Sequence, residues 1–155
     1  MLFRSLINTR FGLVMVSAVT AAALVACGGG ESGAKSEGGK SEGGASGKVE
    51  VTLSEWAIKP SAAKAKAGSV EFAVTNKGAT AHELAVYQTD AAADKLPQAG
   101  GAVDEKQVTV VGRTASLDAN KTESKKMDLK AGKYVLVCNL PAHYGQGMRV
   151  AFTVE

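Results

Sequence analysis

Histidine and cysteine are scarce in this 155-residue chain, which has two residues of each type. The sequence also shows no amphipathic helix pattern, no phosphate-binding glycine loop and no nucleophile elbow. Gly145 and Gly147 resemble part of a dinucleotide-binding motif, but they lead into a strand pattern and not into a helix N-terminus that could face a phosphate. These absences argue against a nucleotide-binding protein and against a hydrolase of the nucleophile-elbow type.

The chain also has little net charge. Lys and Arg exceed Asp and Glu by 18 − 15 = +3, and residues 1–26 contain two Arg and no acid, so the remainder carries 16 − 15 = +1. Nucleic-acid binding requires a clustered basic face. We therefore expect no nucleic-acid partner.

The first 26 residues have the features of a targeting segment. Arg4 and Arg10 accompany an apolar run of 16 residues at 11–26, which is shorter than the roughly 20 residues of a membrane span and typical of a secretory signal. The run ends in Leu-Val-Ala-Cys at 24–27, which resembles the lipobox of bacterial lipoproteins and implies cleavage before Cys27 and lipidation of its sulfur. An uncleaved N-terminal anchor is the alternative. Either interpretation predicts an exported, membrane-anchored protein that faces the periplasm or the cell exterior.

A low-complexity segment follows the lipidation site. Residues 28–47 include nine Gly and four Ser, and the sequence Lys-Ser-Glu-Gly-Gly occurs twice in tandem at 35–44. Such a segment has too little apolar surface to offset the entropy of folding. The sequence therefore predicts a signal peptide at 1–26, a lipidated cysteine with a flexible linker at 27–47, and one folded domain at 48–155.

Apolar and polar residues alternate in many short runs of the domain. They include 49–53, 70–74, 82–86, 108–111, 127–129, 134–138 and 148–154. A period of two predicts half-buried strands, and the run 134–138, which is apolar on both faces, predicts a central strand. About eight such strands with little helix indicate an all-β fold, an antiparallel Greek-key β-sandwich.

Residues 88–106 interrupt the strand pattern. Asp90 is expected to cap a short helix over 91–95, which Pro97 and the Gly-Gly pair at 100–101 would end. An excursion of this length in a small domain is usually functional or mobile. Its role remains open at this point.

The segment 138–148, with the sequence Cys-Asn-Leu-Pro-Ala-His-Tyr-Gly-Gln-Gly-Met, carries the richest chemistry. Cys138, His143 and Met148 recur at five-residue intervals between two strands, and His82 lies where an upstream strand should begin. Their alternation with neighbouring apolar residues predicts that His82, Cys138 and Met148 project toward the core at the same end of their strands. A thiolate, two imidazoles and a weak thioether are the ligands of a blue-copper site. Each residue alone would fit a plain core position, but their joint order and facing favour a metal site.

This constellation resembles the cupredoxin family of type 1 blue-copper proteins, with the Cys-x4-His-x4-Met spacing of its rusticyanin and auracyanin members. The resemblance implies one copper ion bound by His82, Cys138 and His143 in a plane, with Met148 as a weak axial ligand. It also implies that the carbonyl oxygen of Ala81 can approach from the opposite side.

Two residues that follow implied ligands are expected to lie beside the site without binding the metal. Asn139 follows the cysteine, and Glu83 follows the first histidine. Plastocyanin-like and azurin-like relatives usually have Asn at the position of Glu83, so this chain departs from the family pattern there. Hydrogen bonds around a thiolate tune the reduction potential, and the departure therefore affects the expected potential.

The resemblance implies a monomeric one-electron carrier and not an enzyme. His143 would be the electron port, ringed by Pro141, Ala142 and Tyr144, and a redox partner would dock there transiently. Catalytic copper centres need further histidines, and none remains once His82 and His143 are used. A copper carrier or buffer is the main alternative, and a β-sandwich adhesion module without metal is another.

Overall fold

The computed structural model describes residues 47–155. The predicted signal peptide, the lipidation of Cys27 and nearly all of the linker lie outside these residues. Within the described part of the chain, no helix is both long and apolar enough to cross a membrane.

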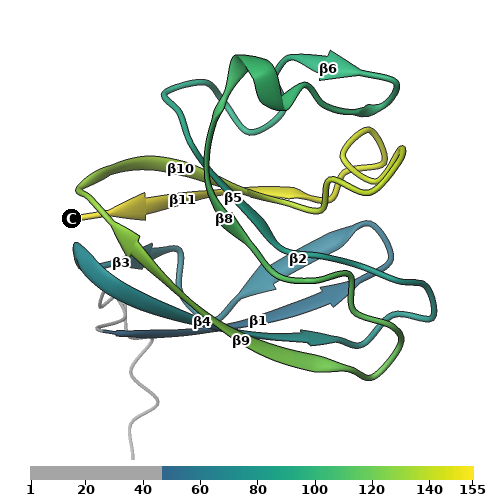
Figure 1. Cartoon of the computed structure of the whole chain (residues 1–155), viewed down its shortest axis with the longest axis horizontal. Helices are drawn as coiled ribbons and strands as arrows, with labels where there is room; N and C mark the ends of the chain where they lie inside the picture. The colour runs from purple at the N-terminus through teal and green to yellow at the C-terminus, as the bar shows by residue number, and fades with distance from the viewer. Residues whose placement is uncertain (1–46) are drawn as a thin grey trace, which may run out of the picture. The chain divides into compact units, whose positions relative to one another are not determined.

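Two β-sheets are stacked face to face (Figure 1). The four-stranded sheet has the order β2-β1-β4-β9 and the five-stranded sheet the order β3-β11-β10-β5-β8. The strands of the first sheet are β1 (Lys48–Ser54), β2 (Ala57–Pro60), β4 (Gly68–Asn76) and β9 (Thr122–Leu129). Those of the second are β3 (Lys64–Ala65), β5 (Ala85–Gln88), β8 (Thr109–Arg113), β10 (Gly132–Val137) and β11 (Arg149–Val154).

The main core lies between the two sheets. Strand β4 shows the alternation that the sequence predicts, since Val70, Phe72 and Val74 are buried while the residues between them are partly exposed. Phe72 meets Phe152 of the opposite sheet edge to face, with ring centroids 5.8 Å apart. Burial of the apolar face of each sheet against the other holds the two layers together.

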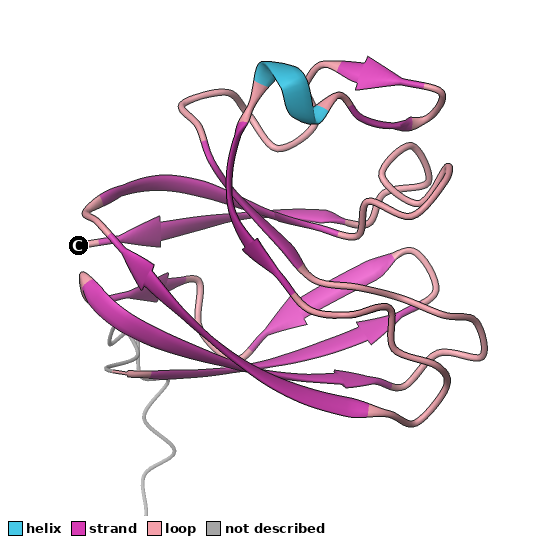
Figure 2. Ribbon diagram, viewed as in Figure 1, coloured by secondary structure: helices cyan, strands magenta, loops and turns pink. Residues whose placement is uncertain are grey.

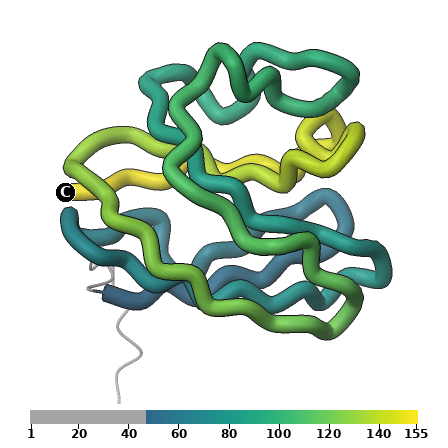
Figure 3. The backbone as a smooth tube through the Cα atoms, viewed as in Figure 1, coloured from purple at the N-terminus to yellow at the C-terminus, as the bar shows by residue number. Residues whose placement is uncertain are grey.

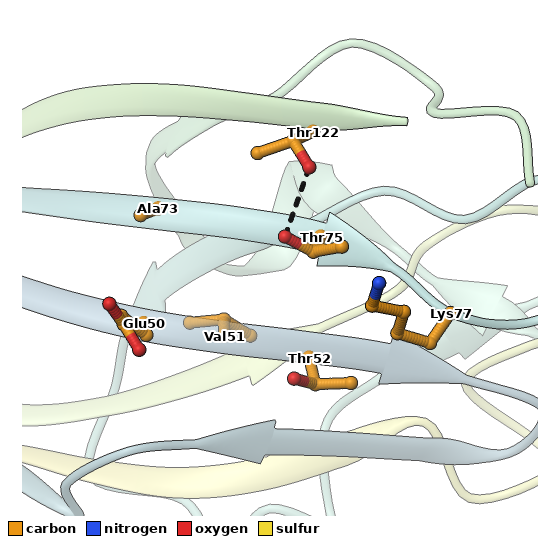
Figure 4. A pocket seen from close by; sticks show the side chains of 7 residues that line it. All are labelled: Glu50, Val51, Thr52, Ala73, Thr75, Lys77 and Thr122. Carbon is orange, nitrogen blue, oxygen red and sulfur yellow. Dashed lines mark hydrogen bonds between the residues drawn. The ribbon is translucent and has the colours of Figure 1, made fainter. Parts of the chain in front are cut away.

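The outer face of the four-stranded sheet carries polar side chains. A pocket there is lined by Glu50, Thr52, Thr75, Lys77 and Thr122, together with Val51 and Ala73 (Figure 4). The hydroxyl groups of Thr75 and Thr122 are hydrogen bonded across β4 and β9 at 3.0 Å. This face has the solvated character expected for one side of a sandwich.

The prediction of an all-β sandwich is confirmed, with strands predominating in the ribbon (Figure 2). Eleven strands are formed by the described residues, and removing the two-residue segments β3, β6 and β7 leaves 11 − 3 = 8, the number expected. Two pairs, β1 with β4 and β11 with β3, are parallel, which corrects the expectation of a purely antiparallel fold. Strand β10 is central, as its two apolar faces predict.

The excursion at 88–106 covers the outer face of the five-stranded sheet (Figure 3). It contains the small hairpin β6 (Gln98–Ala99) and β7 (Ala102–Val103), and the 3-10 helix η1 (Glu105–Gln107) begins at its end. Leu96 and Val103 pack with Tyr87, Val135 and Val137 in a second apolar cluster. This layer explains why β10 is apolar on both faces.

The expected helix over 91–95 is wrong, since these residues form bends and a turn. The hydroxyl of Tyr144 accepts a hydrogen bond from the Leu96 N–H at 3.0 Å and donates one to the Ala93 carbonyl at 2.8 Å. A helix over 91–95 would leave the Ala93 carbonyl without an intrahelical donor, because Pro97 has no N–H. The tertiary contact to Tyr144 therefore replaces a helix too short to be stable alone.

Candidate metal centre

Three segments distant in the sequence meet at one end of the sandwich. They are the loop 138–148 between β10 and β11, the segment 76–84 before β5, and the turn between β1 and β2, on the right in Figure 1. His82 precedes β5, which begins at Ala85, so the expectation that it starts this strand is wrong. It instead forms an isolated bridge with Leu117, through N–H to carbonyl bonds of 3.0 and 2.8 Å. The predicted facing holds, because His82 is fully buried on the side of Leu84.

The loop 138–148 is closed by its own backbone. Cys138 N–H donates to the Met148 carbonyl and Met148 N–H donates to the His143 carbonyl, each at 3.1 Å. Gly147 has φ +114°, a conformation that side-chain-bearing residues rarely adopt, so glycine is required at this turn. The loop thereby returns the chain to β11 and brings Cys138, His143 and Met148 together.

The donor atoms converge on one point. The Cys138 Sγ lies 3.3 Å from His143 Nδ1 and 3.9 Å from His82 Nδ1, and the two Nδ1 atoms are 3.2 Å apart. Cys138, His82 and Met148 are fully buried, whereas His143 is half-buried. The half-buried ring of His143 therefore links this cluster to the surface.

These distances fit a metal ion. Bonds of about 2.0–2.1 Å to nitrogen and about 2.3 Å to sulfur, at tetrahedral to trigonal angles, place donor atoms about 3.2–3.8 Å apart. The separations of 3.2 and 3.3 Å fall within this range, and that of 3.9 Å lies just above it. A thiol, two imidazoles and a nearby thioether form the soft donor set that suits copper.

The environment of the cluster sets the protonation states of its groups. Burial raises the pKa of the Cys138 thiol, while the backbone N–H groups of Glu83 and Leu140 oppose that shift. Burial, together with the nearby His143, lowers the pKa of His82 and favours the neutral imidazole. A metal ion that binds here would therefore displace the thiol proton and find a histidine lone pair available.

Glu83 and Asn139 follow two of the donor residues in the chain, and each has a defined contact. The Glu83 N–H donates to Cys138 Sγ at 3.4 Å, and burial raises the pKa of the Glu83 carboxyl, which faces Arg113 at 3.7 Å. The Asn139 side chain accepts from the Val103 N–H at 2.6 Å and donates to Glu105 at 2.9 Å. Asn139 thus ties the excursion to the cysteine, and Arg113 pairs with Glu105 in the same network.

The predicted exposed rim around His143 needs one correction. Pro141 and Ala142 are exposed, but Tyr144 is fully buried beneath the excursion. Its hydroxyl is held by Ala93 and Leu96, and this contact explains why it points inward. The exposed aromatic residue beside His143 is Trp56, 46% exposed, whose ring meets the imidazole edge to face with centroids 5.4 Å apart.

The sequence did not indicate three residues that contact or support this site. Trp56 lies in the turn between β1 and β2 with an unusual φ of +60°, and Glu55 precedes it. Asn76, which the sequence indicates only as part of a turn, is fully buried and accepts from the Gly78 N–H at 2.8 Å. Its amide also donates to the carbonyls of Thr80 and Leu117, at 2.7 and 2.8 Å. The contacts of Trp56 with His143, of Glu55 with Thr80 and of Asn76 with Leu117 join segments far apart in the chain, and local patterns carry no signal for them.

A two-sheet sandwich with a cysteine, two histidines and a methionine gathered at one end defines a β-sandwich protein with a mononuclear metal centre. A family model described as copper binding proteins of the plastocyanin/azurin family matches residues 45–155. The chain belongs to this family of copper-binding proteins, and copper is its cofactor.

Solved structures support the fold. A reduced auracyanin from Roseiflexus castenholzii is similar with a TM-score of 0.58 and 20% identity, over 73% of this chain and 99% of that one. Auracyanin A from Chloroflexus aurantiacus has a TM-score of 0.54 and 19% identity, over 72% and 100% of the two chains. Rusticyanin from Thiobacillus ferrooxidans has a TM-score of 0.52 and 18% identity, over 70% and 77%. A search of curated proteins found no match.

Proposed function

We propose that this protein is a one-electron carrier with a single type 1 copper site. His82, Cys138 and His143 would hold the ion through Nδ1, Sγ and Nδ1, Met148 would be a weaker fourth ligand, and the Ala81 carbonyl is a predicted weak contact. The observation that carries the proposal is the convergence of the three donor atoms within 4.8 Å of one another, at the buried end of a sandwich of the plastocyanin/azurin family.

Bound copper supplies reversible one-electron chemistry by alternating between Cu(II) and Cu(I). The residues contribute a site that resists rearrangement. Cys138 and His82 have no exposed surface, and the N–H of Glu83 is directed at the cysteine sulfur. A donor set held in this way lowers the structural change that accompanies electron transfer.

The surface around His143 is the proposed electron port. His143 is the one half-buried member among the four proposed ligands. Pro141, Ala142 and Trp56 surround it with apolar surface that could dock on a redox partner through a small, transient interface. Nothing in this arrangement requires catalysis or a second copper site.

The proposal includes location and assembly. The N-terminal sequence and the lipobox-like Cys27 support a lipid-anchored monomer that faces the periplasm or the cell exterior. The main alternative is copper delivery by the same four residues. Fast electron self-exchange between Cu(II) and Cu(I) protein supports the carrier, whereas transfer of the ion to an acceptor apoprotein supports delivery.

Replacing the cysteine tests the site itself. With one equivalent of Cu(II), the protein should show an intense blue absorption from charge transfer between the thiolate and copper. Cys138→Ser removes the sulfur, so we expect that absorption to be abolished and the paramagnetic-resonance spectrum to lose its type 1 character. A Cys138→Ser variant that stays blue would refute the proposed site.

A further inference from the structure

The turn between β1 and β2 places Glu55 against the segment that carries His82. The Oε1 atom of Glu55 accepts hydrogen bonds from the N–H groups of Ala79 at 2.6 Å and Thr80 at 3.0 Å. A Cβ atom at Gly78 would lie 2.7 Å from both carboxylate oxygens, closer than such contacts occur. The carboxylate therefore sits in a backbone cradle that glycine at position 78 leaves open.

The same carboxylate oxygen faces the far side of the His82 ring. Glu55 Oε1 lies 3.7 Å from His82 Nε2. The Thr80 hydroxyl bridges the two groups, at 3.3 Å from Glu55 Oε1 and 3.4 Å from His82 Nε2. His82 has no exposed surface, so these two side chains supply polar contacts that solvent cannot.

The directions of these hydrogen bonds follow from the chemistry of each group. An ionised carboxylate only accepts, so the single proton of the Thr80 hydroxyl is donated to Glu55. The hydroxyl oxygen is then an acceptor, and His82 must carry its proton on Nε2 to donate to it. This arrangement leaves Nδ1 without a proton, and Nδ1 is the atom that lies 3.9 Å from Cys138 Sγ.

We propose that Glu55, acting through Thr80, is a positioning residue that sets the tautomer of His82 and places a negative charge beside the copper site. The inference rests on the proposed function, since it concerns the same donor set. Metal-binding histidines commonly donate their other ring N–H to a carboxylate or carbonyl, which orients the ring and increases its basicity. The backbone N–H groups of Ala79 and Thr80 both donate to the Glu55 carboxylate and so favour its charged form.

The fixed charge has a measurable consequence. A carboxylate near the site stabilises Cu(II) more than Cu(I), because the oxidised ion carries the larger positive charge. Removing the charge should lower the affinity for Cu(II) relative to that for Cu(I) by about tenfold. For a one-electron couple this corresponds to a rise in the reduction potential of about 59 mV.

The test compares two charge-neutralising variants in the full chain. Glu55→Gln keeps an oxygen that can accept hydrogen bonds but removes the charge, and Glu50→Gln removes a charge from an exposed residue on the polar face of β1. Both variants should stay blue with one equivalent of copper. The reduction potential should rise by about 59 mV for Glu55→Gln, which corresponds to the tenfold change in relative affinity, and should stay close to that of the parent for Glu50→Gln.

The tautomer is tested separately in the copper-free protein by nitrogen NMR of the imidazole rings. The parent and Thr80→Ser, which keeps the hydroxyl, should show His82 protonated on Nε2, whereas Thr80→Val should lose this preference. Equal potentials for the two Gln variants, or an unchanged tautomer in Thr80→Val, would overturn the inference. Failure of the parent to bind copper would instead overturn the proposed function, while the NMR result would still decide the tautomer.

Discussion

The two segments that bring the histidines together are held in different ways. The loop 138–148 is held largely by hydrogen bonds within itself, such as His143 N–H to Leu140 at 3.0 Å and Gln146 N–H to Ala142 at 3.0 Å. The segment 76–84 is held by side chains, namely its own Asn76, which bonds to Gly78, Thr80 and Leu117, and Glu55 of the β1–β2 turn, which bonds to Ala79 and Thr80.

This difference has consequences for sequence interpretation and for function. A loop that closes on its own backbone depends on nearby residues, so its spacing can be interpreted from the sequence. The segment 76–84 also needs Leu117 and Glu55, which lie far from it in the chain, so its conformation depends on the assembled sandwich. The first carries the half-buried His143 at the surface, and the second holds His82 in the interior.

The strongest test of the comparison is Asn76→Ala in the side-chain-held segment. The amide of Asn76 satisfies Thr80, Leu117 and Gly78, and it is fully buried. Each buried backbone group that loses its hydrogen-bond partner lowers stability by about 1–3 kcal/mol. We therefore expect Asn76→Ala to lower the free energy of unfolding by about 3 kcal/mol. Urea-induced unfolding measures this change.

The control for Asn76→Ala is Thr122→Ala, which removes an exposed hydrogen bond to Thr75 in the same sheet (Figure 4). It should change the free energy of unfolding by no more than about 0.5 kcal/mol. Equal effects of the two substitutions would contradict the special role assigned to Asn76.

A smaller effect is expected from Tyr144→Phe, which tests the contact between the loop 138–148 and the excursion. The substitution removes the hydroxyl that joins Leu96 and Ala93, at a cost of about 1–2 kcal/mol. Hydrogen exchange of the Leu96 amide should become faster. Tyr134→Phe is the matched control, because its buried ring loses one hydrogen bond, to Lys130, without touching the excursion.

Faster exchange at Leu96 in Tyr144→Phe alone supports the contact between Tyr144 and the excursion. If Tyr134→Phe accelerates exchange at Leu96 as much as Tyr144→Phe does, the Tyr144 hydroxyl has no local role in holding the excursion. The excursion would then be held by its apolar cluster alone.

The smallest change in stability is expected from Trp56→Ala at the surface beside His143. Trp56 is 46% exposed, so the free energy of unfolding should change by less than about 1 kcal/mol and the blue colour should persist. Electron self-exchange should slow, because apolar surface at the proposed port is lost.

The control is Val110→Ala, which shortens the other large exposed apolar side chain among the described residues, 38% exposed, and should leave self-exchange unchanged. Equal self-exchange rates for the two variants would show that Trp56 is not part of the electron port.

Most of the strands and the gathering of the donor residues could be predicted from the sequence, because alternation along a strand reports which side chains are buried. Alternation along β4 and β10 reports burial directly, because successive side chains point to opposite faces of a sheet. The facing of His82 with Leu84 follows from the same rule, although the strand itself begins later. The expected helix over 91–95 failed because Pro97 cannot donate to the Ala93 carbonyl, which is hydrogen bonded to the hydroxyl of Tyr144 instead.

The amino-acid sequence by itself determined the sandwich, the central position of β10 and the set of residues at the copper site, since periodicity and residue type express these locally. Only the tertiary structure decided which neighbours support that site. Trp56 rests against His143, Glu55 reaches His82 through Thr80, and Tyr144 turns inward beneath the excursion. Each of these contacts joins residues that approach one another only when the sheets are packed, and no pattern along the chain encodes such a distance.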